Sequence, residues 1–323
     1  MNKIKNILID LPVTESHKKL FANAAPGMNL IYKKPKNITE ELIGQASIII
    51  GIPKPEMLAF AKNLEWLQLS SAGANLYVQD GILPENVLLT NATGCYGLAI
   101  SEYMVGVLLS LFLKLPLYQK NQQNNLWHSE GRIKSIYGST ALIVGLGDIG
   151  GEFAKRFKAL GGYTIGIRRT DTRKPDYLDE LYLTEQLDEL LPRADVVALS
   201  LPETPQTHKL FDRQRLERIK TGAVLINVGR GMALDTAALC DVLNSGHLGG
   251  AAIDVTDPEP LPPEHPLWKA KNVVITPHVS GNYNLPETLE RVVRLSVDNL
   301  TRYLSGQELN NLVDFSTGYK MHD

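Results

Sequence analysis

A glycine-rich turn lies between an apolar run and a helical pattern near the middle of the chain. Residues 140–144 (TALIV) are followed directly by Gly-Leu-Gly-Asp-Ile-Gly at 145–150, and a helical pattern continues to about residue 160. A GxGxxG turn is a weak signal by itself, but a strand before it and a helix after it are the context that dinucleotide-binding turns require. This segment therefore predicts one unit of a parallel α/β sheet that binds a dinucleotide.

The glycines of this turn have separate physical tasks. Gly145 permits the tight turn, Gly147 lets a pyrophosphate approach the backbone, and Gly150 lets the helix pack closely on the strand. Asp148 and Ile149 begin the helix, whose free N–H groups and positive dipole end favour phosphate. We expect these five residues to contact the cofactor.

The residues after the next strand indicate which dinucleotide is bound. Sites for NAD usually carry Asp or Glu there, about 20 residues after the glycines, to accept a hydrogen bond from the ribose 2′-hydroxyl. Here the predicted strand 163–167 is followed by Arg168, Arg169 and Thr170. Two guanidinium groups and a hydroxyl suit a 2′-phosphate, although basic pairs are more often solvated surface residues. We predict that NADP(H) is favoured and that NAD(H) is possible.

Two series of short apolar runs alternate with helical patterns, as in parallel sheets with helical crossovers. The first series has predicted strands at 7–10, 47–51, 67–70 and 87–90, and helices at 39–44 and 55–62. The second has predicted strands at 140–144, 163–167, 195–200, 223–228, 249–254 and 273–276, and helices at 149–160, 185–191, 212–219 and 235–245. Further helices are predicted at about 101–115 and 286–304.

The last helix follows a second series that already has about six strands, so we expect it to return to the first. The predicted fold class is α/β with two domains. A Rossmann doubly wound parallel sheet, residues 101–285, is inserted into a smaller flavodoxin-like α/β substrate domain, residues 1–100 and 286–323.

Composition argues against several classes of function. A net charge of −2 gives no general attraction to nucleic acid or to anionic lipid. Cys95 and Cys240 are the two cysteines and support neither a disulfide framework nor a zinc site, which favours a reducing, cytoplasmic setting. Residues 1–10 resemble a first strand rather than a secretory signal. The apolar stretch 104–117 contains Lys114 and Pro116 and predicts a buried core helix, not a membrane span.

Three segments of the second half place functional groups just after predicted strands, where open α/β sheets bind ligands: 227–231 (NVGRG), 254–260 (DVTDPEP) and 276–281 (TPHVSG). Reduction of a 2-oxo acid needs a cation for the carboxylate and carbonyl, a proton donor, and a carboxylate that holds this donor. Arg230, His278 and Glu259 suit these tasks. Spacing alone does not bring them together, and each by itself could be an ordinary loop residue.

The ordered segments GLGDIG, LPETPQTH, NVGRG, AAIDVTDPEPLP, HPLW and TPHVSG resemble the D-isomer-specific 2-hydroxyacid dehydrogenase family over nearly the whole chain. The resemblance implies hydride transfer between a nicotinamide and C2 of a small 2-oxo or 2-hydroxy acid, such as glyoxylate or hydroxypyruvate. It also implies that His278 is the acid/base, that Glu259 is its partner, and that Arg230 binds the substrate. Asp254 would face the nicotinamide carboxamide.

The resemblance extends to the first domain. The loop Ser71, Ala72, Gly73 and Ala74 resembles one whose backbone amides hold the substrate carboxylate, and Asn91 and Glu102 match the family's hinge region. After the glycine of this loop, where the family usually has an acidic residue, the chain has Asn75. Further cofactor contacts are implied for Pro202, Thr207, Val228, Gly229, His278, Ser280 and Gly281. Members are commonly dimers, so a homodimer is expected.

Other readings stay open. A phosphoglycerate dehydrogenase would differ only in substrate, although many carry an added regulatory domain for which this length leaves no room. In formate dehydrogenases the partner of the histidine resembles Gln, so Glu259 argues against that activity. A dinucleotide-sensing protein similar to the C-terminal binding protein corepressors would keep the same residues. The sequence does not indicate the side chain of the substrate, because the candidate pocket residues could equally be ordinary packing residues: Tyr96, Leu98, Trp127 and Trp268.

Overall fold

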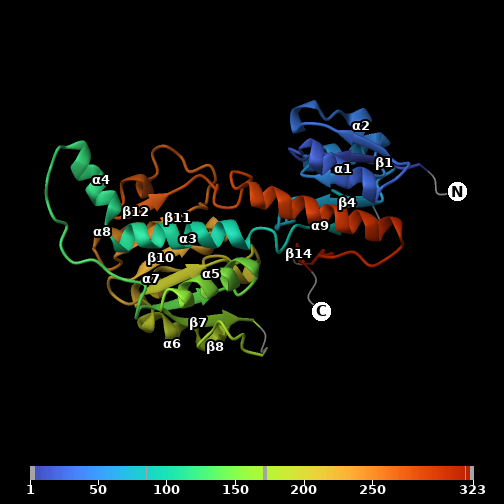
Figure 1. Ribbon diagram of the computed structural model, residues 1–323. Helices are drawn as coiled ribbons and strands as arrows, with labels where there is room; N and C mark the ends of the chain where they lie inside the picture. Colours follow the sequence, from blue (N-terminus) through green and yellow to red (C-terminus); the bar gives the residue numbers. More distant parts are fainter. Residues whose placement is uncertain (1–3, 85, 170–172, 317, 321–323) are drawn as a thin grey trace. The chain divides into compact units, whose positions relative to one another are not determined.

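The chain forms two compact units, which we call the first and the second unit. The computed structural model describes residues 4–84, 86–169, 173–316 and 318–320. The first unit is Met1–Tyr96 with Tyr283–Asp323, and the second is Gly97–Asn282 (Figure 1). Each is built on a parallel sheet with helices, so the predicted α/β fold class is confirmed.

The first unit has a five-stranded parallel sheet in the order β2-β1-β3-β4-β5. Its strands are β1 (Asn6–Ile9), β2 (Asn29–Tyr32), β3 (Ile48–Gly51), β4 (Trp66–Leu69) and β5 (Leu88–Thr90). Its helices are α1 (Glu15–Ala24), α2 (Glu40–Gln45), a 3-10 helix (Pro55–Phe60) and α9 (Pro286–Leu304), and the tail adds a small antiparallel pair, β13 (Val313–Asp314) and β14 (Tyr319–Lys320).

The core of the first unit follows from the alternation of side chains along its strands. Ile7 and Ile9 face a cluster that includes Phe21 of α1 and Val292 of α9, whereas Leu8 faces the opposite cluster near α2. Strands covered on both faces are mostly apolar, which explains the apolar runs that made β1, β3 and β4 predictable; the buried Gln68 of β4 is hydrogen-bonded to Thr90 and Asn299.

The second unit has a seven-stranded parallel sheet in the order β12-β11-β10-β9-β6-β7-β8. Its strands are β6 (Thr140–Val144), β7 (Tyr163–Arg168), β8 (Glu180–Leu183), β9 (Val196–Leu199), β10 (Val224–Asn227), β11 (Gly250–Ile253) and β12 (Val273–Ile275). Its helices are α3 (Gly97–Phe112), α4 (Leu115–Gln123), α5 (Asp148–Ala159), α6 (Leu187–Leu190), α7 (Arg213–Arg218) and α8 (Thr236–Asn244).

The chain reverses its direction across this sheet between β6 and β9, because β7 and β8 lie on one side of β6 and the later strands on the other. Helices α3 and α5 pack together on the face of β6, β7, β10 and β11, whereas α6, α7 and α8 contribute to the core on the other face (Figure 1). Ligands of open α/β sheets bind at such a reversal, at the carboxyl ends of the strands.

The predicted elements omit β2, β8, β13, β14, α1 and α4, and the helix predicted at 55–62 is the 3-10 helix Pro55–Phe60. Strands β2 and β8 each form one edge of their sheet, whereas the strands at the opposite edges, β5 and β12, were predicted. Both missed strands begin with a polar residue, Asn29 or Glu180, which shortens the apolar run by which a strand is recognised in a sequence.

Helix α3 continues into an arm, which we define as residues 113–135. Lys114 has a left-handed backbone conformation, φ 59°, and α4 leaves α3 at an angle of 63°. No single helix in the described part of the chain is long and apolar enough to cross a membrane, although the bent pair α3 and α4 passes that test by length and composition. Seven residues of α3 are buried, among them Met104, Leu108 and Phe112.

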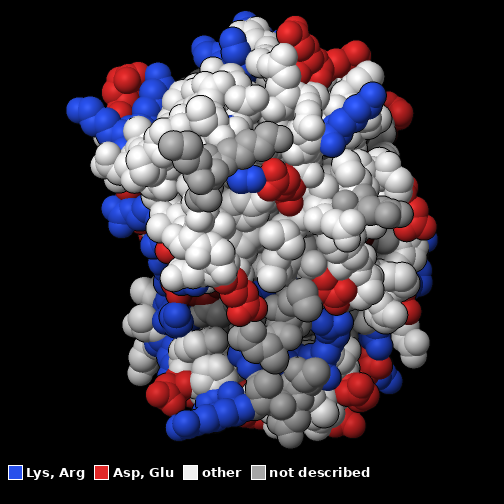
Figure 2. Space-filling model, turned by 90° about the vertical axis from the view of Figure 1, so that its right-hand side faces the viewer, with Lys and Arg blue, Asp and Glu red and all other residues white. Residues whose placement is uncertain are grey.

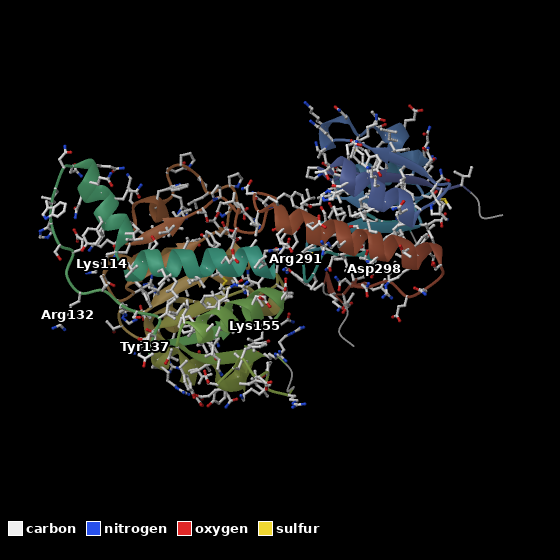
Figure 3. The ribbon with its side chains drawn as sticks, in the orientation of Figure 1. Lys114, Arg132, Tyr137, Lys155, Arg291 and Asp298 are labelled. Carbon is white, nitrogen blue, oxygen red and sulfur yellow. The ribbon has the colours of Figure 1, made fainter. Side chains whose placement is uncertain are left out.

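Charged side chains of both signs are mixed on the surface. Figure 2 shows Lys and Arg side chains among Asp and Glu over the face that it displays. Salt bridges between neighbouring side chains, such as Arg291 with Glu287 on α9 at 3.1 Å, account for part of this mixture (Figure 3). The mixture agrees with the net charge of −2.

Candidate functional site

The sheet order of the second unit makes neighbours of the three catalytic segments predicted from the sequence. Strands β10, β11 and β12 are adjacent and parallel, and each segment follows one of them: 228–231, 254–260 and 276–281. Because parallel strands end at the same edge of the sheet, the three loops emerge side by side. Spacing in the sequence could not establish this neighbourhood.

Two glycines of the β10 loop let it approach its neighbours backbone to backbone. A Cβ atom at Gly229 would lie 2.6 Å from the Leu201 nitrogen, and one at Gly231 would lie 2.0 Å from the Thr256 carbonyl carbon. Both distances are far below a van der Waals contact, so any larger residue would force the loops apart. The NVGRG segment therefore seats Arg230 between two tightly packed loops.

His278 and Glu259 are in direct contact. The imidazole Nδ1 lies 2.7 Å from Glu259 Oε1, and both side chains are exposed to solvent. His278 has a left-handed backbone conformation, φ 52°, and its N–H donates to the Asp254 carbonyl oxygen at 2.8 Å. The carboxylate can hold the ring by Nδ1, which leaves Nε2 available for proton transfer.

The Asp254 carboxylate holds the loop that carries His278. It accepts hydrogen bonds from the Val279 N–H at 3.0 Å, the Ser280 N–H at 3.1 Å and the Thr276 hydroxyl at 2.6 Å, and only 2% of the residue is exposed. The hydrogen-bonding capacity of this buried carboxylate is therefore met by donors within the protein. The structure thus ties Asp254 to the His278 loop, and a contact of Asp254 with the nicotinamide carboxamide stays a prediction.

Tyr103 is a member of this network that the sequence did not single out. Its hydroxyl lies 2.7 Å from Thr276 Oγ1, and burial raises the pKa of the phenol to about 12, so it stays protonated at neutral pH. No local motif marks Tyr103, because its partner lies 173 residues further along the chain.

The Arg230 guanidinium contacts its own surroundings rather than His278. Its Nη1 donates to the Gly229 carbonyl oxygen at 2.8 Å, and Nε lies 3.9 Å from Glu203 Oε2 in the β9 loop. Within the described residues, the structure therefore joins His278 to Glu259 but makes no hydrogen bond between Arg230 and either of them.

The dinucleotide turn follows β6, the strand beside the reversal point. Gly145 has φ 98°, and Cβ atoms at Gly145 and Gly150 would lie 2.7 Å and 1.9 Å from the Ser200 and Gly145 carbonyl oxygens. At Gly147 no atom lies within 4 Å of such a Cβ. Helix α5 starts there without a side-chain cap. Open space beside uncapped N–H groups fits a phosphate, so the turn suits a dinucleotide.

The other predicted cofactor residues lie on the same edge or in nearby loops. Arg168 ends β7 directly beside Gly145 and is half-buried, Arg169 is exposed, and Thr170 lies outside the described residues. The Asp148 carboxylate accepts from the Gly97 N–H at 2.7 Å and so connects α5 to α3. Thr207 donates to the Pro202 carbonyl oxygen at 2.7 Å, which closes the β9 loop on itself.

The predicted carboxylate loop belongs to the first unit and follows β4. Ser71 Oγ donates to the Gly73 carbonyl oxygen at 2.7 Å, and Asn91 Nδ2 donates to the Ala72 carbonyl oxygen at 2.7 Å. The Ala74 N–H donates to the Gly318 carbonyl oxygen at 3.1 Å. The loop is therefore held by Asn91, which follows β5, and by Gly318 of the tail.

Comparison with known proteins identifies the family. Residues 105–280 match the family model described as D-isomer specific 2-hydroxyacid dehydrogenase, NAD binding domain. The chain belongs to the D-isomer specific 2-hydroxyacid dehydrogenase family. The resemblance seen in the sequence is thereby confirmed. Members of this family are nicotinamide-dependent oxidoreductases of 2-hydroxyacids, and the second unit carries the family's NAD-binding domain.

Relatives of known structure or activity resemble the chain over most of its length. A family member from Aeromonas salmonicida shares 35% identity with a TM-score of 0.86, covering 97% of this chain and 100% of that one. An NADPH-dependent glyoxylate/hydroxypyruvate reductase from Sinorhizobium meliloti, solved with NADP and sulfate, shares 25% identity with a TM-score of 0.82, covering 98% and 100%. A glyoxylate reductase from Thermofilum pendens is 31% identical, covering 78% of this chain and 75% of the relative.

Proposed function

We propose that this member of the family is an NADPH-preferring reductase of a small 2-oxo acid of the glyoxylate or hydroxypyruvate kind, with His278 as proton donor. The observation that carries the proposal is the His278–Glu259 contact of 2.7 Å, on the sheet edge that also bears the dinucleotide turn. Similarity to the glyoxylate reductases of Sinorhizobium meliloti and Thermofilum pendens supports the substrate class.

When bound, the nicotinamide supplies the hydride that the substrate C2 accepts. His278, in its protonated form, donates a proton to the oxygen that becomes the hydroxyl, and Glu259 keeps the ring oriented through Nδ1. The Arg230 guanidinium stabilises the negative charge that develops on the same oxygen, an effect of about 2–4 kcal/mol for donors of this kind. Asp254 holds the His278 loop through the Val279 and Ser280 amides.

The substrate carboxylate is assigned to the loop of the first unit. Among the described residues, the amides of Ser71, Ala72 and Gly73 have no hydrogen-bond acceptor, whereas that of Ala74 is used by Gly318. Free successive N–H groups suit an anion. We therefore propose that the amides of Ser71, Ala72 and Gly73, and not that of Ala74, bind the substrate carboxylate.

A direct assay tests the reaction. Oxidation of NADPH and of NADH is measured with glyoxylate, hydroxypyruvate, pyruvate, a branched 2-oxo acid and phosphohydroxypyruvate. We expect turnover with a small substrate and a preference for NADPH. Turnover only with phosphohydroxypyruvate would instead assign the phosphoglycerate dehydrogenase activity. Tight dinucleotide binding without turnover on any 2-oxo acid would favour the sensing role.

Arg168 and Arg169 support the preference for NADPH. Arg168 stands beside Gly145, where a carboxylate would mark an NAD site, and Arg169 follows it, exposed to solvent. We expect Arg168→Asp to raise the KM for NADPH by about tenfold or more, because a carboxylate repels the 2′-phosphate that an arginine binds. The KM for NADH should change little, as steady-state kinetics with both cofactors will reveal.

Arg291→Ala is the matched control for this substitution. Arg291 pairs with Glu287 at 3.1 Å and lies on α9 in the first unit. The Arg291→Ala variant should keep the wild-type KM values for NADPH and for NADH. An equal change of the KM for NADPH and of the KM for NADH in Arg168→Asp would show that Arg168 does not bind the 2′-phosphate.

We also propose that the protein is a homodimer in which the arm takes part. The arm is held together by hydrogen bonds from Asn121 Nδ2 to Glu130 Oε1 at 2.6 Å and from the Glu130 N–H to the Tyr118 hydroxyl at 3.0 Å. It nevertheless exposes Leu115, Leu126, Trp127 and Ile133. Figure 3 labels Lys114 at its start and Arg132 on its returning limb. An ordered arm with exposed apolar side chains is typical of a protein interface.

The mass in solution tests the dimer. Light scattering should give twice the 35.7 kDa of the chain, and Leu126→Asp with Trp127→Asp should give the monomer, because two charges would then be buried at the interface. Phe60→Asp, which changes an exposed apolar residue of the first unit, should stay dimeric. A wild-type monomer at micromolar concentration would refute the dimer. A cytoplasmic location also stays a proposal, supported by two buried cysteines, neither of which is in a disulfide.

A further inference from the structure

The carboxylate loop of the first unit is held in a pattern that distinguishes its peptide groups. Three consecutive carbonyl oxygens accept hydrogen bonds: that of Ser71 from the Ala92 N–H at 2.8 Å, that of Ala72 from Asn91 Nδ2 at 2.7 Å, and that of Gly73 from Ser71 Oγ at 2.7 Å. The Gly73–Ala74 peptide is also held at its other end, because the Ala74 N–H donates to Gly318.

This pattern sets the directions of two amides. In a planar trans peptide the N–H points opposite to the C=O. When the Ser71 and Ala72 carbonyls are bound to residues 91 and 92 beside β5, the Ala72 and Gly73 N–H groups must point the other way. The two amides therefore lie on the side of the loop that faces away from β5.

The C-terminal tail supports this arrangement from behind. Asn311 Nδ2 donates to the Thr93 carbonyl oxygen at 2.7 Å and to the Asn91 carbonyl oxygen at 3.3 Å. The Asn91 N–H in turn donates to the Asn311 carbonyl oxygen at 3.1 Å. Asn91 is fully buried, so the residue that holds the Ala72 carbonyl is itself fixed by Asn311.

Helix α9 anchors the tail in turn. Asn299 donates to the Asn310 carbonyl oxygen at 3.0 Å and accepts from the Asn310 N–H at 2.8 Å. Asn299 also donates to Gln68 Oε1 in β4 at 2.8 Å, and both side chains are fully buried. The tail is thus connected by hydrogen bonds to the rigid core on one side and to the loop on the other.

We propose that Asn91, Asn311 and Gly318 are positioning residues that aim the Ala72 and Gly73 amides at the substrate carboxylate. We call these three residues the C-terminal brace. The inference rests on the proposed function, since it takes this loop as the carboxylate site. The brace acts through hydrogen bonds to the loop and need not touch the substrate.

Gly318→Val disturbs the brace, and Gly306→Val is its matched control. Both glycines have left-handed backbones, with φ 71° and 67°, so valine strains both to a similar degree. A Cβ at Gly318 would lie 3.3 Å from the Asn75 Cα, next to the loop, whereas one at Gly306 has no atom within 4 Å. The pair therefore separates the contact with the loop from backbone strain.

The kinetic readout is the KM for the 2-oxo acid. For Gly318→Val we expect it to rise about tenfold, because charge-assisted hydrogen bonds depend on alignment. The KM for NADPH should stay as in the wild type, and Gly306→Val should leave both values unchanged. Asn311→Gly is the second variant: it removes the side-chain donors while tolerating the left-handed backbone of Asn311, φ 58°, and should raise the same KM.

A readout without turnover separates this inference from the proposed function. In hydrogen–deuterium exchange the Ala74 amide, bonded to Gly318 in the wild type, should exchange faster in Gly318→Val but not in Gly306→Val. Oxalate, as a probe of the carboxylate site, should bind Gly318→Val about tenfold more weakly. Equal exchange and equal oxalate affinity in the two valine variants would overturn the brace, even if the enzyme reduces 2-oxo acids. Faster exchange with unchanged oxalate affinity would also overturn it, since the brace would then be structural only.

Discussion

Replacement of His278 by alanine should lower kcat for the 2-oxo acid by about 10²–10⁴-fold, the usual contribution of a positioned general acid. The His278 side chain is exposed and its Nδ1 lies at hydrogen-bond distance, 2.7 Å, from Glu259 Oε1, so its loss leaves no buried cavity. Folding and dinucleotide affinity should therefore stay near wild type. Single-turnover kinetics and the Kd for NADPH, measured by fluorescence, separate these quantities.

Glu259→Gln provides a graded comparison with this variant. The amide oxygen of glutamine can still accept a hydrogen bond from Nδ1, but without the charge of the carboxylate that bond is weaker and orients the ring less well, so kcat should fall to a value between those of wild type and His278→Ala. His265→Ala is the control, because the His265 ring caps a 3-10 helix by accepting from the Leu267 N–H at 3.1 Å and, among the described residues, has no hydrogen bond to Glu259 or His278. Normal turnover in His278→Ala would remove His278 from the mechanism.

The second large effect is expected at Gly147. We predict that Gly147→Ala weakens NADPH binding about ten- to hundredfold, or about 1.4–2.8 kcal/mol, and leaves the melting temperature unchanged. The φ of Gly147 is −74°, which alanine adopts without strain, and the added methyl would meet no protein atom within 4 Å. The methyl would enter the space where a pyrophosphate approaches the backbone. Calorimetric titration with NADPH measures the loss.

In the same turn, Gly150→Ala differs from Gly147→Ala because the added methyl has no free space. Its Cβ would lie 1.9 Å from the Gly145 carbonyl oxygen, so the β6–α5 connection would have to move. We expect this variant to lose thermal stability as well as affinity. If Gly147→Ala bound NADPH like the wild type, the open space at Gly147 would not be the phosphate site.

The interior strands of both sheets were predictable because burial on both faces demands apolar residues at each position. Strand β6 and helix α9 were predicted with their observed bounds, Thr140–Val144 and Pro286–Leu304. Strands β2 and β8 were not predicted, because a polar residue at the start of each shortens its apolar run. The helix predicted at 185–191 is divided in the structure into α6 and two 3-10 helices, Thr184–Gln186 before it and Leu191–Arg193 after it.

The candidate site was predictable as chemistry but not as geometry. The types of Arg230, Glu259 and His278 and their places after strands are local properties that a sequence displays. Their neighbourhood depends on β10, β11 and β12 being adjacent, which no spacing specifies. The structure joins His278 to Glu259 and directs the Arg230 guanidinium to Gly229 and Glu203 instead.

Local patterns along this chain were therefore enough for the α/β class, the glycine turn and the candidate catalytic groups, because each depends on residues within a few turns of one another. The network of Tyr103, Thr276 and Asp254 and the brace on the carboxylate loop join residues that are far apart in the chain. Asn311 and Asn91, for example, are 220 positions apart. Hydrogen bonds of this kind follow from how strands and helices pack, so they become visible only once the chain is folded.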